Sequence, residues 1–218
     1  MLARILRYTI SFCLMVGLLQ AQTDTTVRKG LVRVNLDLLS PVYGYFSDAP
    51  AKRMGGELML EISKNDTLFY LLETGYHSME YTRDLFSTKS AGQFIRLGVN
   101  RNLMKYYNNK DRDILYIGAR VSASYYQVDY PVFIEKSSYW GEAKVSISSA
   151  NYLAFWAEAV AGTRIEIVKS LFMGADLRGA LMIYNTNQSD YKSLFVPGFG
   201  NPLKGASLWV NYSVGFKF

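Results

Sequence analysis

Several carboxylates in this sequence lie at spacings that could support acid–base chemistry. Glu57 is followed by Glu61, and Glu158 is followed by Glu166. Two carboxylates held close together can divide the roles of general acid and general base. Even spacings also put both members of a pair on one face of a β-strand, where arginines from neighbouring strands can neutralise them. We expect ion pairing with arginine and assign no catalytic role to either pair.

His77 offers a second possible chemistry. It is the only histidine in the chain, and Ser78 and Glu80 follow it closely. A histidine, a serine and a carboxylate could hydrolyse a lipid or a peptide if the fold aligned them. A metal site is not expected, because there is no second histidine and the only cysteine is Cys13. We expect His77 to be solvated beside an external loop or to lie at a membrane interface, and we predict no catalytic residue, metal or cofactor.

The elements that carry these residues are strands, and the last strand is the most informative. From Leu208 to Phe218, apolar residues alternate with other residues up to the terminal carboxylate. Chain ends of soluble proteins usually fray, whereas the last strand of an outer-membrane barrel faces lipid and closes against the first. This ending resembles the sorting signal read by the outer-membrane assembly machinery. The residues of the predicted assembly signal are Val210, Tyr212, Val214, Phe216 and Phe218.

The N-terminus predicts export. Residues 1–21 combine a basic start at Arg4 and Arg7, an apolar stretch and a small residue, Ala21, at the expected cleavage point. This is the pattern of a secretory signal peptide, and the apolar stretch is shorter than the ~20 residues that a spanning helix requires. We predict a signal peptide over residues 1–21, a periplasmic leader over residues 22–29 and a barrel domain over residues 30–218.

The composition fits a membrane barrel. Hydrophobic residues make up 50% of the chain, including 17 Tyr, 12 Phe and 3 Trp. After residue 21 no apolar stretch is long enough for a spanning helix, so the apolar residues are spread by alternation, and the aromatic residues suit girdles at two membrane interfaces. The formal charge of +6 would fall to +4 on loss of Arg4 and Arg7. This charge is modest and dispersed, so no nucleic-acid partner is expected.

Alternating segments predict an all-β fold, a transmembrane antiparallel up-and-down barrel of eight strands. Short connections follow the second and sixth strands, an intermediate one follows the fourth, and long ones follow the third, fifth and seventh. Outer-membrane barrels alternate short periplasmic turns with longer outer loops in this way, and an even strand count leaves both termini in the periplasm. A soluble lipocalin-like barrel also alternates, but the apolar C-terminus and the charge distribution favour the membrane version. The predicted strands span residues 31–46, 55–63, 67–79, 93–103, 114–127, 151–167, 171–185 and 208–218, and the predicted long loops span residues 80–92, 128–150 and 186–206.

The polar faces of these strands carry charges of both signs. An arginine facing lipid would cost roughly 2–4 kcal/mol near the membrane midplane, so these charges are expected to point inward. An eight-stranded barrel is only wide enough to be filled by its own side chains, and buried charges in so narrow a space must pair. The sequence therefore predicts a closed, salt-bridged lumen and no wide pore. The predicted lumen network consists of Glu57, Glu61, Glu73, Arg96, Arg120, Glu158, Arg164, Glu166, Asp176 and Arg178.

Four short motifs resemble those of a known family. They are Tyr139-Trp140-Gly141-Glu142, Trp156-Ala157-Glu158 with Gly162 and Glu166, Leu171-Phe172-Met173-Gly174, and Val196-Pro197-Gly198-Phe199. Over nearly the whole mature chain, the sequence resembles the domain of unknown function family 6048, a family of outer-membrane barrels found in Bacteroidota. The resemblance implies a small barrel in the outer membrane. It implies no catalytic residues, since the family carries no established activity.

Three functions are compatible with these observations. The favoured one is a small non-enzymatic barrel that stabilises the envelope or presents loops to an extracellular partner of unknown identity. The alternatives are an outer-membrane enzyme that acts on lipid or peptide near His77, and a narrow conduit or transport accessory. In each case we expect the bacterial outer membrane as the location, with its lipids and, during insertion, the assembly machinery as partners.

Overall fold

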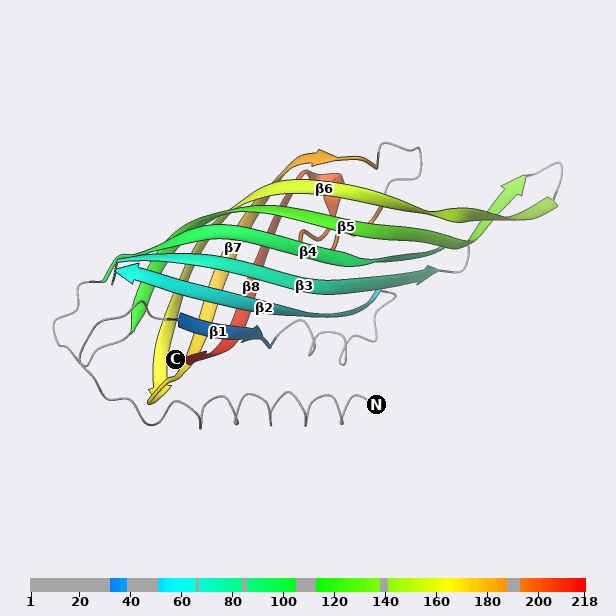
Figure 1. Cartoon of the computed structure of the whole chain (residues 1–218). Helices are drawn as coiled ribbons and strands as arrows, with labels where there is room; N and C mark the ends of the chain where they lie inside the picture. Colours follow the sequence, from blue (N-terminus) through cyan, green and yellow to red (C-terminus); the bar gives the residue numbers. More distant parts are fainter. Residues whose placement is uncertain are drawn as a thin grey trace.

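The computed structural model is a closed sheet of eight strands (Figure 1). It describes residues 32–38, 51–65, 67–83, 86–104, 113–137, 141–187 and 193–218. No helix among these residues is long and apolar enough to cross a membrane. A short 3-10 helix, η1 (Pro202–Lys204), precedes the last strand. The strands are β1 (Val32–Asp37), β2 (Ala51–Asn65), β3 (Leu68–Arg83), β4 (Phe86–Asn102), β5 (Ile114–Ser137), β6 (Gly141–Val168), β7 (Leu171–Asn185) and β8 (Ala206–Lys217).

Closure of the barrel depends on pairing between its first and last strands. Every strand is antiparallel to its neighbours in the sequence, and β1 pairs with β8 so that Val34 lies opposite Phe216. The Phe218 N–H then donates to the Val32 carbonyl at 3.0 Å. Closure gives the backbone groups of both terminal strands a partner, which a strand needs in order to cross a membrane. The predicted eight-stranded antiparallel barrel is confirmed.

The two ends of the barrel differ. The C-terminus and the short β2–β3 and β6–β7 turns lie at one end, the turn end (Figure 1), where the Lys217 N–H donates to the Ser170 carbonyl at 2.9 Å. The β3–β4, β5–β6 and β7–β8 connections lie at the other end, the mouth. There the paired β5 and β6 extend beyond the rest of the sheet (Figure 1).

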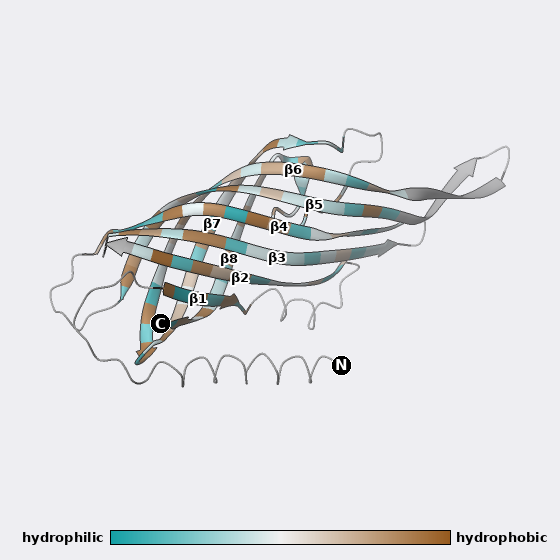
Figure 2. Ribbon diagram, viewed as in Figure 1, coloured by the Kyte–Doolittle hydropathy of each residue, from teal (hydrophilic) through white to brown (hydrophobic). Residues whose placement is uncertain are grey.

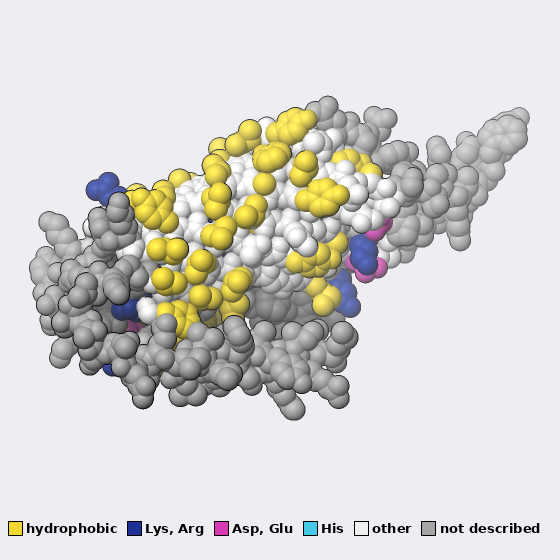
Figure 3. Space-filling view, viewed as in Figure 1, with side chains coloured by type: hydrophobic (Ala, Val, Ile, Leu, Met, Phe, Trp, Pro, Cys, Tyr) yellow, Lys and Arg dark blue, Asp and Glu magenta, His cyan; other side chains and the backbone are white. Residues whose placement is uncertain are grey.

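Alternation along each strand separates an apolar exterior from a largely polar interior. In β4, Ile95 and Leu97 are 46% and 53% exposed, whereas Arg96 between them is 1% exposed. Because successive side chains point to opposite faces of a sheet, one register determines both surfaces. Hydropathy alternates along the ribbons in Figure 2, and apolar side chains cover much of the described outer surface in Figure 3, with charged ones toward the two ends. The middle of the barrel thus carries an exposed apolar belt.

The borders of this belt are marked by residues that lie side by side on neighbouring strands. Toward the mouth, Tyr76, Gln93 and Tyr125 lie side by side on β3, β4 and β5 and are all exposed. Toward the turn end, the exposed Arg101 follows Val99 on the outer face of β4. Tyrosine prefers the interface between lipid and water, and arginine avoids the lipid interior. These residues therefore delimit the height of an apolar surface that lipid would cover.

Two of the predicted long loops are strand instead. The β3–β4 hairpin remains paired up to Arg83 and Phe86, so most of residues 80–92 is sheet. The β5–β6 hairpin remains paired up to Ser137 and Gly141, which includes most of residues 128–150. The loop predictions were wrong because an antiparallel hairpin can continue beyond the belt, where polar side chains on its outer face meet water.

A row of charges on the outer face accompanies this extension. Lys52, Glu80, Lys89 and Asp129 are register neighbours across β2, β3, β4 and β5, on the mouth side of the belt. Opposite charges directly across an antiparallel pair stabilise it modestly. The polar residues in the segments predicted as loops are therefore compatible with continued pairing of the strands.

Three predicted features lie outside the described residues. They are the signal peptide over residues 1–21, the leader over residues 22–29, and the part of the first predicted strand beyond residue 38. In the described β1, Arg33, Asn35 and Asp37 are buried between more exposed apolar neighbours, as expected for an alternating strand.

Aromatic residues fill much of the interior that charges do not occupy. One buried cluster near the mouth includes Phe94, Tyr126, Trp156, Val196 and Phe199. A second cluster consists of Phe69, Ile114, Tyr116 and Val160. Large rigid rings fill a narrow bore with little loss of rotamer freedom. The charged side chains described next pack against these rings.

Candidate functional site in the barrel interior

The strands turn most of the predicted network residues into the interior. Each lies on the inward-facing parity of its strand, so burial follows from alternation. Glu57 is the least enclosed of the interior set, with 9% of its side chain exposed. Eight of the ten predicted residues are 4% exposed or less, namely Glu61, Glu73, Arg96, Arg120, Glu158, Arg164, Asp176 and Arg178.

Arg96 lies at the centre of the larger group of ion pairs. Its Nη1 is 2.8 Å from Glu57 Oε2 and 3.1 Å from Glu73 Oε2. Its Nε donates to Glu158 Oε1 at 2.8 Å, which also accepts from the Trp156 indole at 2.6 Å. A planar guanidinium with several N–H groups can hold carboxylates from different directions. Arg96 thereby ties β4 to β2, β3 and β6 across the bore.

Two further arginines surround Glu73. Arg178 Nη1 lies 3.0 Å from Glu73 Oε2, and Arg120 Nη1 lies 2.8 Å from Glu73 Oε1. Arg178 Nη2 donates to Asp176 Oδ2 at 3.1 Å, and Asp176 also accepts from the Tyr116 hydroxyl. Buried charges are tolerated only when they are paired and hydrogen bonded. The central cluster consists of Glu57, Glu73, Arg96, Arg120, Glu158, Asp176 and Arg178.

A smaller group, the turn-end cluster, surrounds Glu61. Its carboxylate pairs with Arg164 and with Arg33 Nη1, the latter at 3.4 Å. The Arg33 guanidinium lies between two rings, 4.6 Å from the Phe172 centroid and 5.4 Å from the Phe69 centroid. Stacking on aromatic faces is a common way to accommodate a buried guanidinium. Arg33 is not among the ten predicted network residues.

Glu166, the tenth predicted network residue, has a different position. It is half-buried near the end of β6, and its Oε1 accepts from the Ser170 N–H at 3.0 Å. Its own N–H donates to Asp113 at 2.9 Å. A carboxylate that accepts a backbone N–H stabilises a tight turn. The geometry therefore connects Glu166 with the β6–β7 turn.

The connection from β7 to β8 folds back into the mouth, whereas a long external loop was predicted over residues 186–206. Residues 193–200 are here called the plug, and from Phe195 to Phe199 every residue is buried. Val196 to Phe199 form a type II turn, with Pro197 in second place, Gly198 at φ +80° in third place, and a 3.0 Å bond from the Phe199 N–H to the Val196 carbonyl. The dipeptide Pro-Gly signals this turn, but it does not signal on which side of the barrel wall the turn lies.

The tip of the plug is bound by side chains of the barrel wall. Arg96 Nη2 donates to the Gly198 carbonyl at 2.8 Å, and Ser90 Oγ donates to the Phe195 carbonyl at 2.8 Å. A Cβ atom on Gly198 would approach the Phe94 ring to 2.6 Å, so the turn fits only with glycine at its tip. The external-loop prediction for this part of residues 186–206 was wrong, because the interior offers hydrogen-bonding partners and apolar surface that water-exposed loops lack.

His77 also belongs to the interior. Its side chain is 16% exposed, and its Nε2 lies 3.5 Å from Glu57 Oε1. Its Nδ1 accepts from the Gly198 N–H at 3.4 Å, and its ring packs against Phe94 with a centroid distance of 4.9 Å. The predicted solvated or interfacial position was wrong, because His77 has the inward parity of β3 and the plug covers it.

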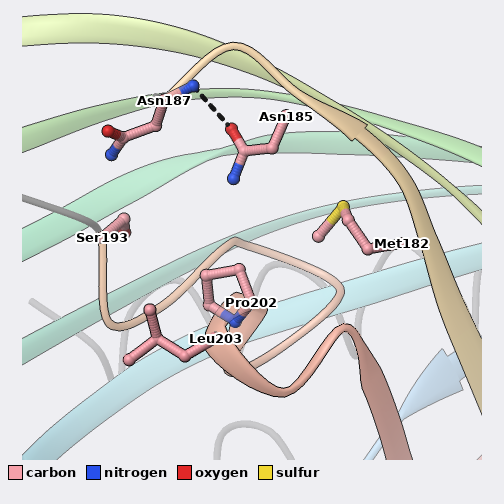
Figure 4. A pocket seen from close by; sticks show the side chains of 6 residues that line it. All are labelled: Met182, Asn185, Asn187, Ser193, Pro202 and Leu203. Atoms are coloured by element: carbon pink, nitrogen blue, oxygen red, sulfur yellow. Dashed lines mark hydrogen bonds between the residues drawn. The ribbon is translucent and has the colours of Figure 1, made fainter. Parts of the chain in front are cut away.

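A small cavity lies beside the plug at the mouth (Figure 4). Its volume is about 190 Å³. Asn185 Oδ1, at its edge, accepts from the Tyr126 hydroxyl at 2.9 Å and from the Asn187 N–H at 3.0 Å. Within the described part of the chain, no group of three His, Cys, Asp or Glu side chains is arranged to hold a metal ion. The lining residues are Met182, Asn185, Asn187, Ser193, Pro202 and Leu203.

The residues of the predicted assembly signal face outward on the last strand. Val210 and Tyr212 are each 48% exposed and Phe216 is 36% exposed. Val214 and Phe218 are half-buried. All five have the same parity, so they line one face of the sheet up to the terminus. That face continues the apolar belt.

The family model described as "Domain of unknown function (DUF6048)" matches residues 3–218. The chain belongs to this family. No curated protein matches the chain. Membership in the DUF6048 family confirms the resemblance noted in the sequence, while an origin in Bacteroidota stays a prediction.

Several solved structures are similar to this DUF6048 chain over 87% of its length. The N-terminal β-barrel domain of Pseudomonas aeruginosa OprF has 12% identity and a TM-score of 0.45, with 97% of that chain covered. Neisserial surface protein A has 12% identity and a TM-score of 0.46, with 97% covered. The attachment invasion locus protein Ail of Yersinia pestis has 8% identity and a TM-score of 0.46, with 99% covered.

Proposed function

We propose that this protein is a small barrel of the bacterial outer membrane that stabilises the envelope or presents its mouth to an interaction partner. The exposed apolar belt supports this location, because so large an apolar surface is unfavourable in water and favourable in lipid. The predicted signal peptide supports export. In the proposed orientation, the turn end and both termini face the periplasm, and the mouth faces outward.

The observation that carries a structural or interaction role is that the interior is filled at two levels. The plug occupies the mouth, with Gly198 bonded to Arg96 at 2.8 Å. The central cluster links strands across the bore with ion pairs such as Arg178 to Glu73 at 3.0 Å. A barrel of eight strands has no room for a wide channel beside these side chains. A solute pathway is therefore not the favoured function.

The mouth supplies the proposed interaction surface. The β5–β6 hairpin reaches farthest from the belt (Figure 1), and the paired backbone continues to Ser137 and Gly141. Exposed hairpins and loops on a rigid scaffold commonly carry recognition functions. We propose that outer-membrane lipids surround the belt. We also propose that the C-terminal strand contacts the assembly machinery during insertion.

No specific observation favours the enzyme alternative near His77. Ser78 has the opposite parity on β3, so its side chain lies on the other face of the sheet from the imidazole. Glu57, the carboxylate next to His77, is engaged by Arg96 at 2.8 Å. A nucleophile and its base must be within hydrogen-bond reach. An activity toward lipid or peptide that His77→Ala abolished would overturn this conclusion.

Two measurements on the full-length protein test the proposal. After cell fractionation, the protein should be in the outer membrane, and unboiled and boiled samples should migrate differently on a denaturing gel, because a closed barrel resists detergent until heated. In planar bilayers the purified protein should show no large steady conductance. Recovery in the soluble periplasm, or wide and stable channels, would contradict the proposal.

A further inference from the structure

Two side chains of opposite hydrogen-bonding character hold the tip of the plug. Arg96 donates from Nη2 to the Gly198 carbonyl at 2.8 Å, whereas His77 accepts the Gly198 N–H at Nδ1 at 3.4 Å. Arginine is a donor at every accessible pH, but an imidazole nitrogen accepts only while it carries no proton. The seated plug therefore requires that Nδ1 of His77 be unprotonated.

The surroundings of the second ring nitrogen, Nε2, indicate which neutral tautomer of His77 is present. His77 Nε2 lies 3.5 Å from Glu57 Oε1. Because Nδ1 accepts the Gly198 N–H, the proton of the neutral ring belongs on Nε2, which lies near this carboxylate. A second proton, added at Nδ1, would point at the Gly198 N–H. Two donors that face each other cannot form a hydrogen bond, and their partial charges repel.

We propose that His77 makes the plug a proton-sensitive closure of the mouth. At neutral pH, the free Nδ1 seats the Val196–Phe199 turn. In acid, the imidazolium keeps its contact with Glu57 and loses its bond to Gly198, so the plug is held only by its remaining bonds to Arg96 and Ser90 and opens more often. This device goes beyond the envelope role proposed above and does not depend on the identity of a partner.

Charged groups on three strands act on His77. Burial of the ring opposes the imidazolium most strongly, and Arg96 on β4 and Arg53 on β2 also oppose it, while Glu57 on β2 and Asp37 on β1 favour it. Glu57 keeps its bonds to Arg96 whether or not His77 is protonated, because arginine stays charged. The remaining ring neighbours are apolar, namely Phe94 and Phe195.

Release of the plug would expose the mouth wall without opening a channel. The ion pairs of Arg178 with Glu73 and Asp176, at 3.0 and 3.1 Å, involve no plug residue and would persist. Ser90, in contrast, is 3% exposed and donates to the Phe195 carbonyl of the plug at 2.8 Å. Access to position 90 therefore reports on whether the plug is seated.

A thiol-accessibility experiment tests the proposal. Because Cys13 is the only cysteine in the sequence and lies in the predicted signal peptide, a Ser90→Cys variant carries one nearly isosteric reporter. It is reacted with a membrane-impermeant maleimide at pH 8 and at pH 4.5, and the lower value lies well below the ordinary titration of histidine because burial opposes protonation of this ring. Ser149→Cys, at an exposed position on β6, corrects for the smaller thiolate fraction in acid.

The expected result is a rise of about tenfold in the corrected labelling rate of Ser90→Cys at pH 4.5, since loss of one hydrogen bond changes an opening equilibrium by roughly that factor. His77→Asn in the Ser90→Cys background keeps an acceptor near Nδ1 that cannot be protonated, so the rise should disappear. His77→Gln serves as a second neutral variant if His77→Asn does not assemble.

Two outcomes would overturn the proposal. One is a corrected labelling rate of Ser90→Cys that is equal at the two pH values. The other is an acid response that persists in the neutral variants. Bilayer conductance of the same samples should stay absent at both pH values. The labelling rates therefore test the closure of the mouth, and the conductance separately tests the proposed non-conducting envelope role.

Discussion

Arg96 and Gly198 are joined by a 2.8 Å hydrogen bond from a guanidinium on β4 to a backbone carbonyl in the β7–β8 connection, across 102 positions of sequence. The same guanidinium holds Glu57, Glu73 and Glu158. One side chain therefore links the ion pairs of the barrel interior to the plug that covers them. The interior and the mouth are consequently coupled parts of one structure.

Gly198→Ala should unseat the plug. Alanine would be strained at φ +80°, and its Cβ would collide with the Phe94 ring. We expect a loss of about 2–4 kcal/mol in the free energy that holds the plug, measured as faster proteolysis between β7 and β8 and a lower temperature of heat modification.

Gly205→Ala is the matched control. Gly205 also has positive φ, +66°, but nothing within 4 Å of its missing Cβ, so it should cost only about 1 kcal/mol. Equal effects of the two variants would show that the Phe94 contact is unimportant.

Arg178→Ala should destabilise the barrel strongly. It would leave the buried Asp176 without its arginine partner and would remove one of the three arginines around Glu73, at a cost on the order of 3–5 kcal/mol. Heat modification and denaturant unfolding in detergent would measure the loss. Leu177→Met, the adjacent position on the outer face, preserves volume and should cost under about 1.5 kcal/mol. An Arg178→Ala variant as heat-resistant as the parent would mean that the polar face is not a packed interior.

Leu97→Arg tests the apolar belt. Leu97 is 53% exposed on β4, and an arginine there should cost roughly 2–4 kcal/mol if lipid covers the site. Gln127→Arg, exposed above the Tyr125 border, should be nearly neutral because its side chain would reach water. Unfolding of both variants from lipid vesicles gives the comparison. Equal stabilities would argue against a lipid-covered belt.

The C-terminal strand should direct assembly. Phe218→Ser, or removal of the last three residues, should sharply lower the amount of protein in the outer membrane and leave cleavage of the predicted signal peptide intact. The reason is the apolar face that runs to Phe218, whose N–H also bonds to Val32 at 3.0 Å. Lys217→Ser, of inward parity, is the control. Quantitative fractionation measures the effect, and normal levels for both terminal variants would refute the assignment.

The faces of the strands could be predicted from sequence because the period of a strand is local. Leu97 and Arg96 must point to opposite sides of any strand that contains both, and a charge that cannot face lipid must face inward. The same argument identified most of the ion-pairing residues. It could not identify Arg33 as a member of the turn-end cluster, because the Phe69 and Phe172 rings that flank it come from other strands.

Pairing partners and the path of the plug were decided only by the tertiary structure. Which carboxylates meet Arg96 depends on the register of β2, β3, β4 and β6 around a closed sheet, and register is a non-local property. The turn at Pro197 and Gly198 is encoded locally, but its inward direction depends on the partners that Arg96, Ser90 and His77 supply there. His77 was misplaced for the same reason, since its cover lies more than a hundred residues away at Gly198. Alternation determines the side of the wall on which a residue lies, and only the closed barrel determines what it meets there.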